Sequence, residues 1–179
     1  MNKSIAELYS ANEIAARVEQ LAAEIKEKHK DNNLVVLGVL EDSFVFLADL
    51  LRRLDTPIHT NFLRFDHRSF GGLQDLSFST QADIRNQNVL LVEGVLETGV
   101  TQAYILEQLK ERGAANVEIC VLVDKPDRRR ASIEADWRAF ETHEDYVFGY
   151  GLGFHERFRE LPFLATFAPM GGTKKEKAS

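Results

Sequence analysis

Cysteine is almost absent from this sequence, and so is any stretch that would carry the chain into a membrane. The single thiol, Cys120, excludes an internal disulfide framework and suits a reducing compartment. It lies in an apolar run, which predicts a buried and unreactive thiol. No apolar run approaches the ~20 residues of a membrane-spanning helix, and no hydrophobic signal segment follows Met1. We therefore expect a cytoplasmic protein with no membrane partner.

Positive charge is not in excess either. Lysine and arginine number 22 against 28 for aspartate and glutamate, a formal net charge of −6, so no overall field attracts nucleic acid. The five histidines show no metal-ligand spacing, and we assign no metal to them. The 179 residues, 44% hydrophobic and 28% charged, suit one globular domain. We expect that domain to span residues 1–170, with a flexible tail over 171–179.

Apolar runs alternate with segments of helical periodicity along most of the chain. Ser10 and Glu13 have the spacing of a capping box, at the start of a helix that ends near residues 31–33. Residues 67–81 have little periodicity and predict a long mobile loop. Further helices are expected over 44–54 and from about 101 to 112, and strands over 34–40, 58–65, 89–92, 117–123, 137–140, 146–150 and 163–167.

The alternation predicts an α/β fold with a doubly wound, mostly parallel sheet flanked by helices, because the strands are apolar throughout. In such sheets ligands bind beyond the carboxyl ends of the strands, near the point where the strand order reverses. The loops at residues 41–43, 93–101 and 124–130 each follow a predicted strand. We expect these three loops to face one crevice.

The loop Glu97-Thr98-Gly99-Val100-Thr101 joins a buried strand to a helix and has the composition of a phosphate site. The threonines supply hydroxyl donors, and the glycine lets the backbone approach an anion closely. The start of the helix adds free amides and the positive end of the helix dipole. No Walker lysine is present, so this is not a nucleoside-triphosphatase loop. Spacing alone leaves a capped turn without a ligand as an equal alternative.

A resemblance decides between these alternatives. Residues 89–101, Val-Leu-Leu-Val-Glu-Gly-Val-Leu-Glu-Thr-Gly-Val-Thr, resemble the phosphoribosyl-pyrophosphate motif of type I phosphoribosyltransferases. Four other segments resemble hypoxanthine-guanine phosphoribosyltransferase in order and spacing: 43–50, 123–126, 146–152 and 157–162. The resemblance extends from about Ser10 to Phe167 and implies the fold of that family, with a small hood built from the terminal segments.

The family transfers a phosphoribosyl group from phosphoribosyl pyrophosphate to N9 of hypoxanthine or guanine, with Mg²⁺, and its members form dimers or tetramers. The resemblance therefore implies a homodimer or homotetramer that binds phosphoribosyl pyrophosphate or a purine nucleoside monophosphate. The implied site residues are Thr98, Gly99, Val100 and Thr101 for the 5′-phosphate, Glu93 for the ribose, Lys125, Tyr146 and Val147 for the purine, Glu41, Asp42 and Arg159 for pyrophosphate, and Glu97 as the catalytic acid on the purine ring nitrogen.

The sequence departs from the family pattern in the half of the site that holds pyrophosphate and metal. Glu41-Asp42 replaces the usual Lys-Gly, which sets two carboxylates against an anionic substrate. Glycine replaces an acid at Gly94 and at Gly153, so that Mg²⁺ binding is doubtful. Glu97 replaces an aspartate and lengthens the arm that carries the acid.

One further departure lies in the predicted loop, where Arg68-Ser69-Phe70 replaces Ser-Ser-Tyr. Family members also bend the pyrophosphate loop through a cis peptide, which here would join Leu40 to Glu41, and a trans bond would indicate a relaxed loop.

We interpret the chain as a purine-salvage homologue with weak or absent turnover. Three alternatives remain: a working enzyme, a non-catalytic purine-nucleotide-binding regulator or partner protein, and an enzyme for another base or phosphorylated sugar.

Some of these residues also have a purely structural interpretation. Glu41 and Asp42 could cap the following helix, and Lys125 could be a solvated loop lysine. Residues 128–130, three consecutive arginines, predict an exposed basic turn, with contact to phosphate or to a second subunit as the alternative.

Overall fold

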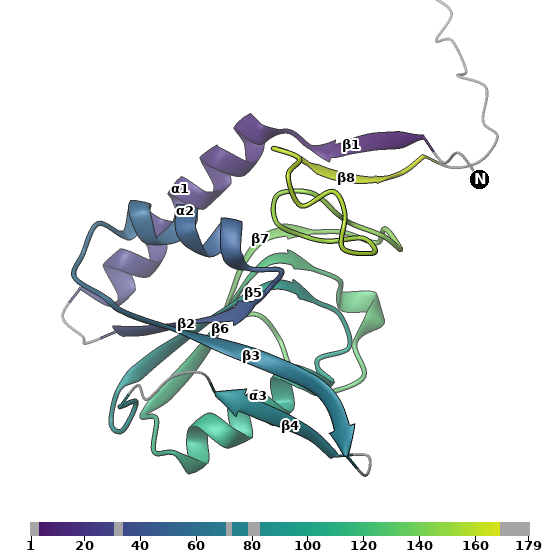
Figure 1. Cartoon of the computed structure of the whole chain (residues 1–179). Helices are drawn as coiled ribbons and strands as arrows, with labels where there is room; N and C mark the ends of the chain where they lie inside the picture. Colours follow the sequence, from purple (N-terminus) through teal and green to yellow (C-terminus); the bar gives the residue numbers. More distant parts are fainter. Residues whose placement is uncertain (1–3, 31–33, 71–72, 79–82, 169–179) are drawn as a thin grey trace, which may run out of the picture.

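The computed structural model describes residues 4–30, 34–70, 73–78 and 83–168 (Figure 1). The tail predicted over 171–179 lies outside these residues. The elements are β1 (Ile5–Tyr9), α1 (Ala11–Lys28), β2 (Leu34–Leu40), α2 (Phe44–Leu54), β3 (His59–Phe70), β4 (Leu73–Phe78), β5 (Asn88–Leu96), α3 (Val100–Glu111), β6 (Asn116–Asp124), a short 3-10 turn (Pro126–Arg128), β7 (Trp137–Glu141) and β8 (Leu164–Phe167).

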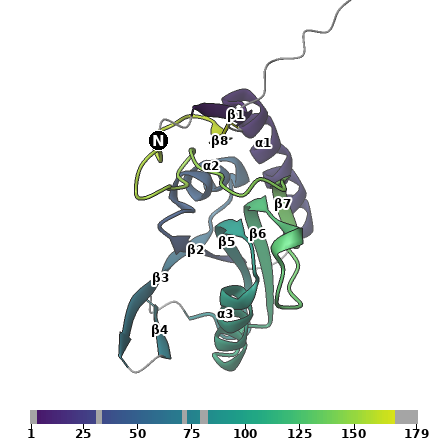
Figure 2. The ribbon, with the colours of Figure 1, turned by 90° about the vertical axis from the view of Figure 1, so that its right-hand side faces the viewer.

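The main sheet has the strand order β4-β3-β2-β5-β6-β7, in which only β4 is antiparallel to its neighbour. Helices α1 and α2 cover one face and α3 the other (Figures 1 and 2). Alternate residues of β5 serve the two faces: Leu90 and Val92 pack with the α1–α2 side, and Val89 and Leu91 with the α3 side. The expected doubly wound, mostly parallel sheet is confirmed.

The connections leave the sheet in opposite directions at β2 and β5. The chain passes from β2 through α2 to β3 on one side, and from β5 through α3 to β6 on the other. The order of the strands therefore reverses between β2 and β5, which are hydrogen-bonded neighbours. In a doubly wound sheet the carboxyl ends of such a strand pair open a crevice that ligands use.

The first helix begins as its capping box predicts. The Ser10 hydroxyl accepts a hydrogen bond from the Glu13 amide, and the Glu13 carboxylate accepts one from the Ser10 amide at 2.8 Å. Its buried face consists of the apolar residues at helical spacing, Ile14, Val18, Leu21 and Ile25 together with Ala22.

A second, two-stranded sheet forms the hood, and the first of its strands was not predicted. β1 pairs antiparallel with β8, with Ala6 opposite Thr166. The pattern of β1 gives no apolar alternation, since its residues are exposed or half-buried. β8 lies where a strand was expected, and its first three residues are buried.

Two secondary-structure predictions are wrong. The mobile loop predicted over 67–81 is largely an antiparallel pair, because β3 continues to Phe70 and β4 follows at 73–78. A strand pair at the edge of a sheet tolerates polar residues, and these residues hide the apolar alternation from which a strand is predicted. The strand predicted over 146–150 is an irregular segment with two isolated bridges, from Phe148 to Ala165 and from Gly149 to Leu152. The left-handed φ angles of Gly149, 96°, and Tyr150, 49°, break any ladder there.

The cysteine prediction is confirmed. Cys120 is fully buried in the core, and burial raises the pKa of its thiol. Among the described residues no helix is both long and apolar enough to cross a membrane.

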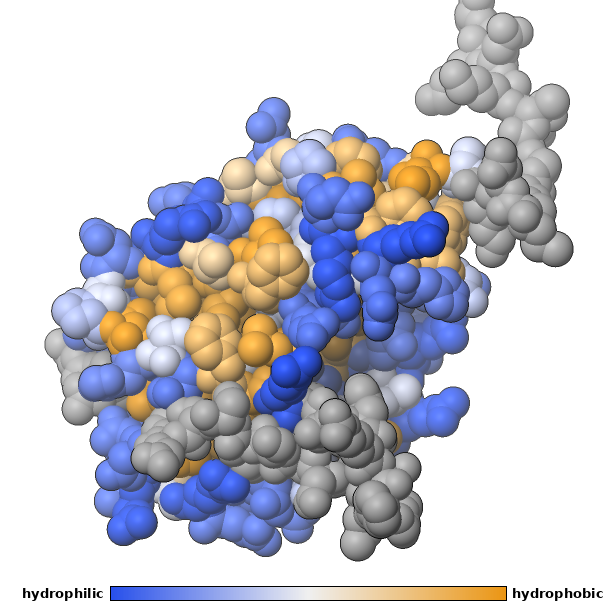
Figure 3. Space-filling view, viewed as in Figure 1, coloured by the Kyte–Doolittle hydropathy of each residue, from blue (hydrophilic) through white to orange (hydrophobic). Residues whose placement is uncertain are grey.

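Apolar side chains also remain on the surface. Phe44 of α2 is 46% exposed and Phe62 of β3 is 41% exposed. Figure 3 shows apolar surface on the face of the molecule that these two elements share.

Candidate functional site

A cleft of about 370 Å³ lies at the carboxyl ends of the strands, where the loops after β2, β5 and β6 meet beneath the hood. The three loops face one crevice, as expected. The lining consists of Asp42, Val95, Glu97, Thr98, Thr101, Gln102, Lys125, Asp145, Tyr146, Val147, Leu152, Gly153 and Phe154. Seven predicted site residues are among them; those that are not are Glu41, Glu93, Gly99, Val100 and Arg159.

The loop at the start of α3 is built to present backbone amides. Gly99, with φ of 76°, is the N-cap residue, and no side chain caps the helix. The N-cap residue therefore uses none of the first-turn amides, although the Val100 amide donates a long hydrogen bond, 3.4 Å, to the Thr98 hydroxyl. Thr98 and Thr101 line the cleft on either side of them, and Val100 is 56% exposed. A single phosphate has the charge and the acceptor oxygens that this arrangement favours.

The backbone of this loop is held by the loop after β6. The carbonyl of Thr98 accepts hydrogen bonds from the amides of Arg130, 2.8 Å, and Ala131, 3.0 Å. The guanidinium of Arg129 donates to the carbonyl of Glu97 and pairs with Asp124, which is 1% exposed. Hydrogen bonds and an ion pair thus join the loops that follow the neighbouring strands β5 and β6.

These contacts correct part of the prediction for the three arginines. Arg128 and Arg130 are exposed, as expected of a basic turn, and Arg128 pairs with Asp145. Arg129 is half-buried and binds the backbone of the loop after β5, a role that the sequence did not indicate.

Lys125 is not a solvated lysine. It is 4% exposed, and its ammonium donates to the carboxylate of Glu97 and to the carbonyl of Asp145, at 3.0 Å. An ammonium has three N–H donors, so two partners leave one donor for an acceptor in the cleft. Glu97 lines the cleft with its side chain about half exposed, and its carboxylate lies beside the Lys125 ammonium.

Aromatic rings form the wall of the cleft next to Lys125. Tyr146 is 49% exposed and meets Phe154 edge-on, with ring centroids 5.4 Å apart, and Phe167 at 6.1 Å. Val147 lines the cleft beside it. An exposed aromatic face beside a buried donor can hold a flat heterocycle with a carbonyl oxygen at its edge.

Glu93 lies behind the cleft rather than in it. The side chain is 4% exposed, its Oε2 accepts a hydrogen bond from the Gln102 amide, and its Oε1 has no partner. Burial raises the pKa of the Glu93 carboxyl from 4.5 to about 7, and the Gln102 hydrogen bond offsets part of the rise. Contact with a ribose would require this buried side chain to become accessible from the cleft.

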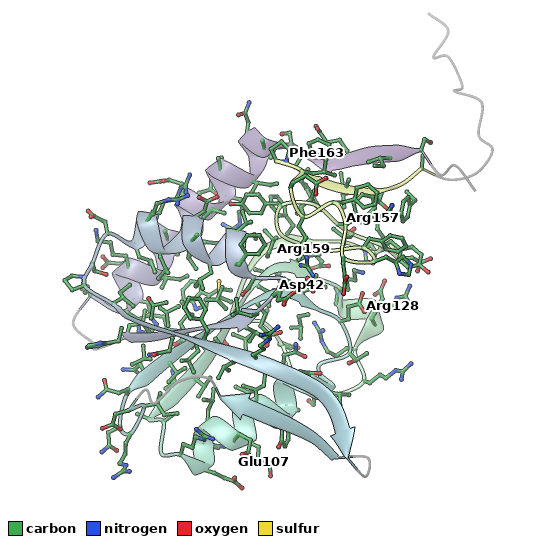
Figure 4. The ribbon with its side chains drawn as sticks, in the orientation of Figure 1. Asp42, Glu107, Arg128, Arg157, Arg159 and Phe163 are labelled. Atoms are coloured by element: carbon green, nitrogen blue, oxygen red, sulfur yellow. The ribbon has the colours of Figure 1, made fainter. Side chains whose placement is uncertain are left out.

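The loop after β2 carries the two carboxylates that replace the family's Lys-Gly. The Leu40–Glu41 bond is cis, not trans. Asp42 pairs with Arg159, which reaches it from beneath the hood (Figure 4). Glu41 lies 3.3 Å from Arg64 and 4.0 Å from Arg159. Neither carboxylate caps α2, since no side chain makes the N-cap hydrogen bond, so the capping interpretation is wrong.

Glycine occupies two of the positions near these carboxylates, Gly94 and Gly153. Glycine side chains at Gly94 and Gly153 offer no oxygen, and Asp42 is already paired with a guanidinium. Across the part of the chain that the structure describes, no three His, Cys, Asp or Glu side chains are grouped to hold a metal ion.

Sequence reasoning missed three residues that shape the site: Gln102, Arg129 and Phe154. Gln102 had a signal, because it shares the buried face of α3 with Ile105 and Leu109, where a polar residue needs a partner. The other two lie in irregular loops, where no periodicity indicates which side chains they meet.

Comparison with known proteins gives one consistent result. Residues 4–157 match the family model of the phosphoribosyl transferase domain. The hypoxanthine-guanine phosphoribosyltransferase of Staphylococcus epidermidis is 38% identical over 165 residues, covering 89% of this chain and 91% of the relative. That of Bacillus subtilis is 33% identical over 172 residues, 90% of this chain and 92% of the relative.

The comparison of structures agrees with the comparison of sequences. A crystal structure of a hypoxanthine-guanine phosphoribosyltransferase from Bacillus anthracis superposes with a TM-score of 0.86 at 28% identity, covering 94% of this chain and 100% of that one. On both grounds the chain belongs to the hypoxanthine-guanine phosphoribosyltransferase family.

Proposed function

We propose that this member of the family binds a purine nucleoside monophosphate in its cleft and transfers phosphoribosyl groups from phosphoribosyl pyrophosphate weakly or not at all. One observation carries the proposal. Thr98 and Thr101, expected to hold the phosphate, line one cleft with the three residues expected to hold the purine, whereas the arginine expected to hold pyrophosphate is paired with Asp42.

In the bound state the 5′-phosphate accepts hydrogen bonds from the first amides of α3 and from the hydroxyls of Thr98 and Thr101. The remaining donor of Lys125 meets O6 of the purine, and the ring of Tyr146 lies against the base. In phosphoribosyl transfer, the Glu97 carboxylate would take the ring N–H proton that the free base loses as the new bond forms, with Lys125 as its counter-ion. No step runs through a metal ion.

Transfer requires more than this half of the site. Stabilising a departing pyrophosphate needs positive charge and room for its oxygens, and here Glu41 and Asp42 supply negative charge. Each lost stabilisation of the transition state weighs exponentially on the rate.

Two measurements test the proposal. Guanosine or inosine monophosphate without metal is expected to raise the melting temperature, since a ligand that binds only the folded state stabilises it. Formation of the monophosphates from free base, Mg²⁺ and phosphoribosyl pyrophosphate is expected to be slow. Rapid formation would instead establish a working enzyme, and no thermal shift at millimolar nucleotide would contradict the binding site.

Replacing Thr101 by valine tests the phosphate position. The variant loses a hydroxyl that donates to an anion, so we expect guanosine monophosphate to bind about tenfold more weakly by isothermal titration calorimetry. Guanosine, which has no phosphate, should bind equally to both proteins. The matched control is Thr56→Val, an exposed threonine outside the cleft, which should leave both affinities unchanged.

We also propose that the protein is cytoplasmic and forms a homodimer or homotetramer. The exposed Phe44 and Phe62 support self-association, because contiguous apolar surface is costly to leave in water. Light scattering coupled to gel filtration should give a mass of two or four times the chain's 20.3 kDa. A strict monomer at micromolar concentration would contradict the expectation.

A further inference from the structure

Four positions at which this chain differs from its family, or carries a residue expected to meet pyrophosphate, lie around Asp42: Asp42 itself, Gly94, Gly153 and Arg159. They come from the loop after β2, from β5 and from the segment beneath the hood. Asp42 Oδ1 accepts a hydrogen bond from the Arg159 guanidinium and lies 3.4 Å from the amide nitrogen of Gly153. The four residues therefore form one cluster, which we call the Asp42–Arg159 cluster.

Gly94 makes room for Asp42. A Cβ atom at Gly94 would lie 2.9 Å from both the Cβ and the backbone carbonyl oxygen of Asp42, and 2.6 Å from Cδ2 of Leu152. Real Cβ atoms do not approach backbone this closely, so a side chain at 94 and the present position of Asp42 exclude each other. The loss of an acid at 94 and the presence of Asp42 are thus linked sterically.

Gly153 leaves the space in which the end of the Arg159 side chain lies. A Cβ atom at Gly153 would lie 2.7 Å from Cζ and Nη2 of Arg159. In the space that glycine leaves, the guanidinium is held on one side by Asp42 and on another by the carbonyl of Gly151, at 2.6 Å. Its side chain is only 26% exposed.

The charges within the cluster are already balanced. Arg159 has Asp42 as a direct partner and Glu41 at 4.0 Å, and the other neighbour of Glu41 is Arg64, at 3.3 Å. A second anion entering here would have to displace a carboxylate held by the chain itself, or remain next to it.

We propose that Asp42 is a specificity-determining residue: as a built-in counter-ion of Arg159, it makes the cleft accept ligands with one phosphate and reject those with a diphosphate. The idea rests on the proposed nucleotide site, since it concerns the other half of the same cleft. Gly94 and Gly153 belong to the device, because each provides the space that one partner of the ion pair fills.

The test uses inorganic pyrophosphate as the probe, in calorimetry without added metal. The wild-type protein is expected to bind it weakly. Asp42→Asn keeps the size of the side chain and removes its charge, so the affinity for pyrophosphate should rise about tenfold. The affinity for guanosine monophosphate should change by less than about threefold. Asp42→Gly is a second variant, which should raise pyrophosphate affinity at least as much.

Glu107→Gln is the matched control for net charge. Glu107 is exposed on α3, far from Asp42 and Arg159 (Figure 4), and its loss should leave pyrophosphate affinity unchanged. In an Arg159→Gln background, Asp42→Asn should give little further gain, because the pair no longer exists.

Three results would overturn the proposal. These are equal pyrophosphate affinity in the wild type and in Asp42→Asn, an equal gain in Glu107→Gln, or a full gain from Asp42→Asn when Arg159 is absent, which would indicate general repulsion. Failure of guanosine monophosphate to bind the wild type would contradict the proposed function instead. The pyrophosphate comparison would still decide the role of Asp42.

Discussion

Phosphoribosyl transfer to hypoxanthine is expected to rise by at least about 100-fold when Glu41→Lys, Asp42→Gly, Gly94→Asp and Gly153→Asp are introduced together. The four changes remove two negative charges from the pyrophosphate loop and return two acids to the metal half of the site. Each change is expected to restore about 1–3 kcal/mol of transition-state stabilisation, and about 1.4 kcal/mol corresponds to tenfold in rate. The measurement is the rate of inosine monophosphate formation with Mg²⁺ and phosphoribosyl pyrophosphate.

The order of the changes matters, because the positions are in contact. Gly94→Asp alone should lower the free energy of unfolding by about 1–3 kcal/mol, since its Cβ would meet the backbone of Asp42 at 2.9 Å. Combined with Asp42→Gly, the loss should shrink, because one of the two crowded atoms is gone and glycine frees the loop backbone. Urea unfolding of the two single variants and the double variant measures this coupling.

The fourfold variant also has its own control. Adding Thr101→Val should lower whatever rate is gained, since the phosphate position would be weakened in the same cleft. A folded fourfold variant with unchanged activity would mean that the residue roles inferred from the family do not apply to this chain.

At pH 8, Glu93→Gln is expected to raise the free energy of unfolding by about 3 kcal/mol more than it does at pH 4. The carboxyl of Glu93 has a pKa of about 7 in the folded chain, against 4.5 for an unperturbed glutamate. One pKa unit corresponds to about 1.4 kcal/mol, so the difference amounts to about 3 kcal/mol.

The direction follows from which state holds the proton. Between pH 4.5 and about 7 the folded chain keeps the Glu93 proton and the unfolded chain does not. The free energy of unfolding therefore falls as pH rises through this range, and remains low above it. Glutamine has no proton to lose, so the variant lacks this component of the pH dependence.

Urea unfolding of the variant and the wild type from pH 4 to pH 8 measures the difference between the two curves. Glu107→Gln removes an exposed carboxyl on α3 and should give curves parallel to those of the wild type. Parallel curves for Glu93→Gln as well would show that Glu93 ionises normally in the folded protein.

The sequence predicted the fold where local pattern dominates. Ser10 and Glu13 placed the start of α1, and uninterrupted apolar runs placed β2, β5 and β6 and the parallel sheet. Failures came where backbone conformation or pairing partners dominate. Left-handed φ angles at Gly149 and Tyr150 prevent a strand that composition favours. β1 has no signal of its own and depends on β8.

Part of the site could likewise be predicted from the sequence, and part could not. The loops that line the cleft could be predicted, because parallel strands bring their carboxyl ends to one edge of the sheet. The pair Asp42–Arg159 could not, since it joins side chains 117 residues apart and no periodicity links them. The space left by Gly94 and Gly153 is likewise invisible until the neighbouring atoms are placed.

Among the strands of the described residues, β8 comes latest along the chain, and it pairs with β1, which comes earliest. A chain leaving the ribosome has made the whole main sheet and the loop at α3 before Leu164–Phe167 exists. Joining segments so far apart along the chain costs entropy that the local parts of the sheet do not incur. The aromatic wall, in which Phe167 meets Tyr146, is therefore completed last. If the cleft binds a nucleotide as proposed, its phosphate position exists in the nascent chain before its base position does.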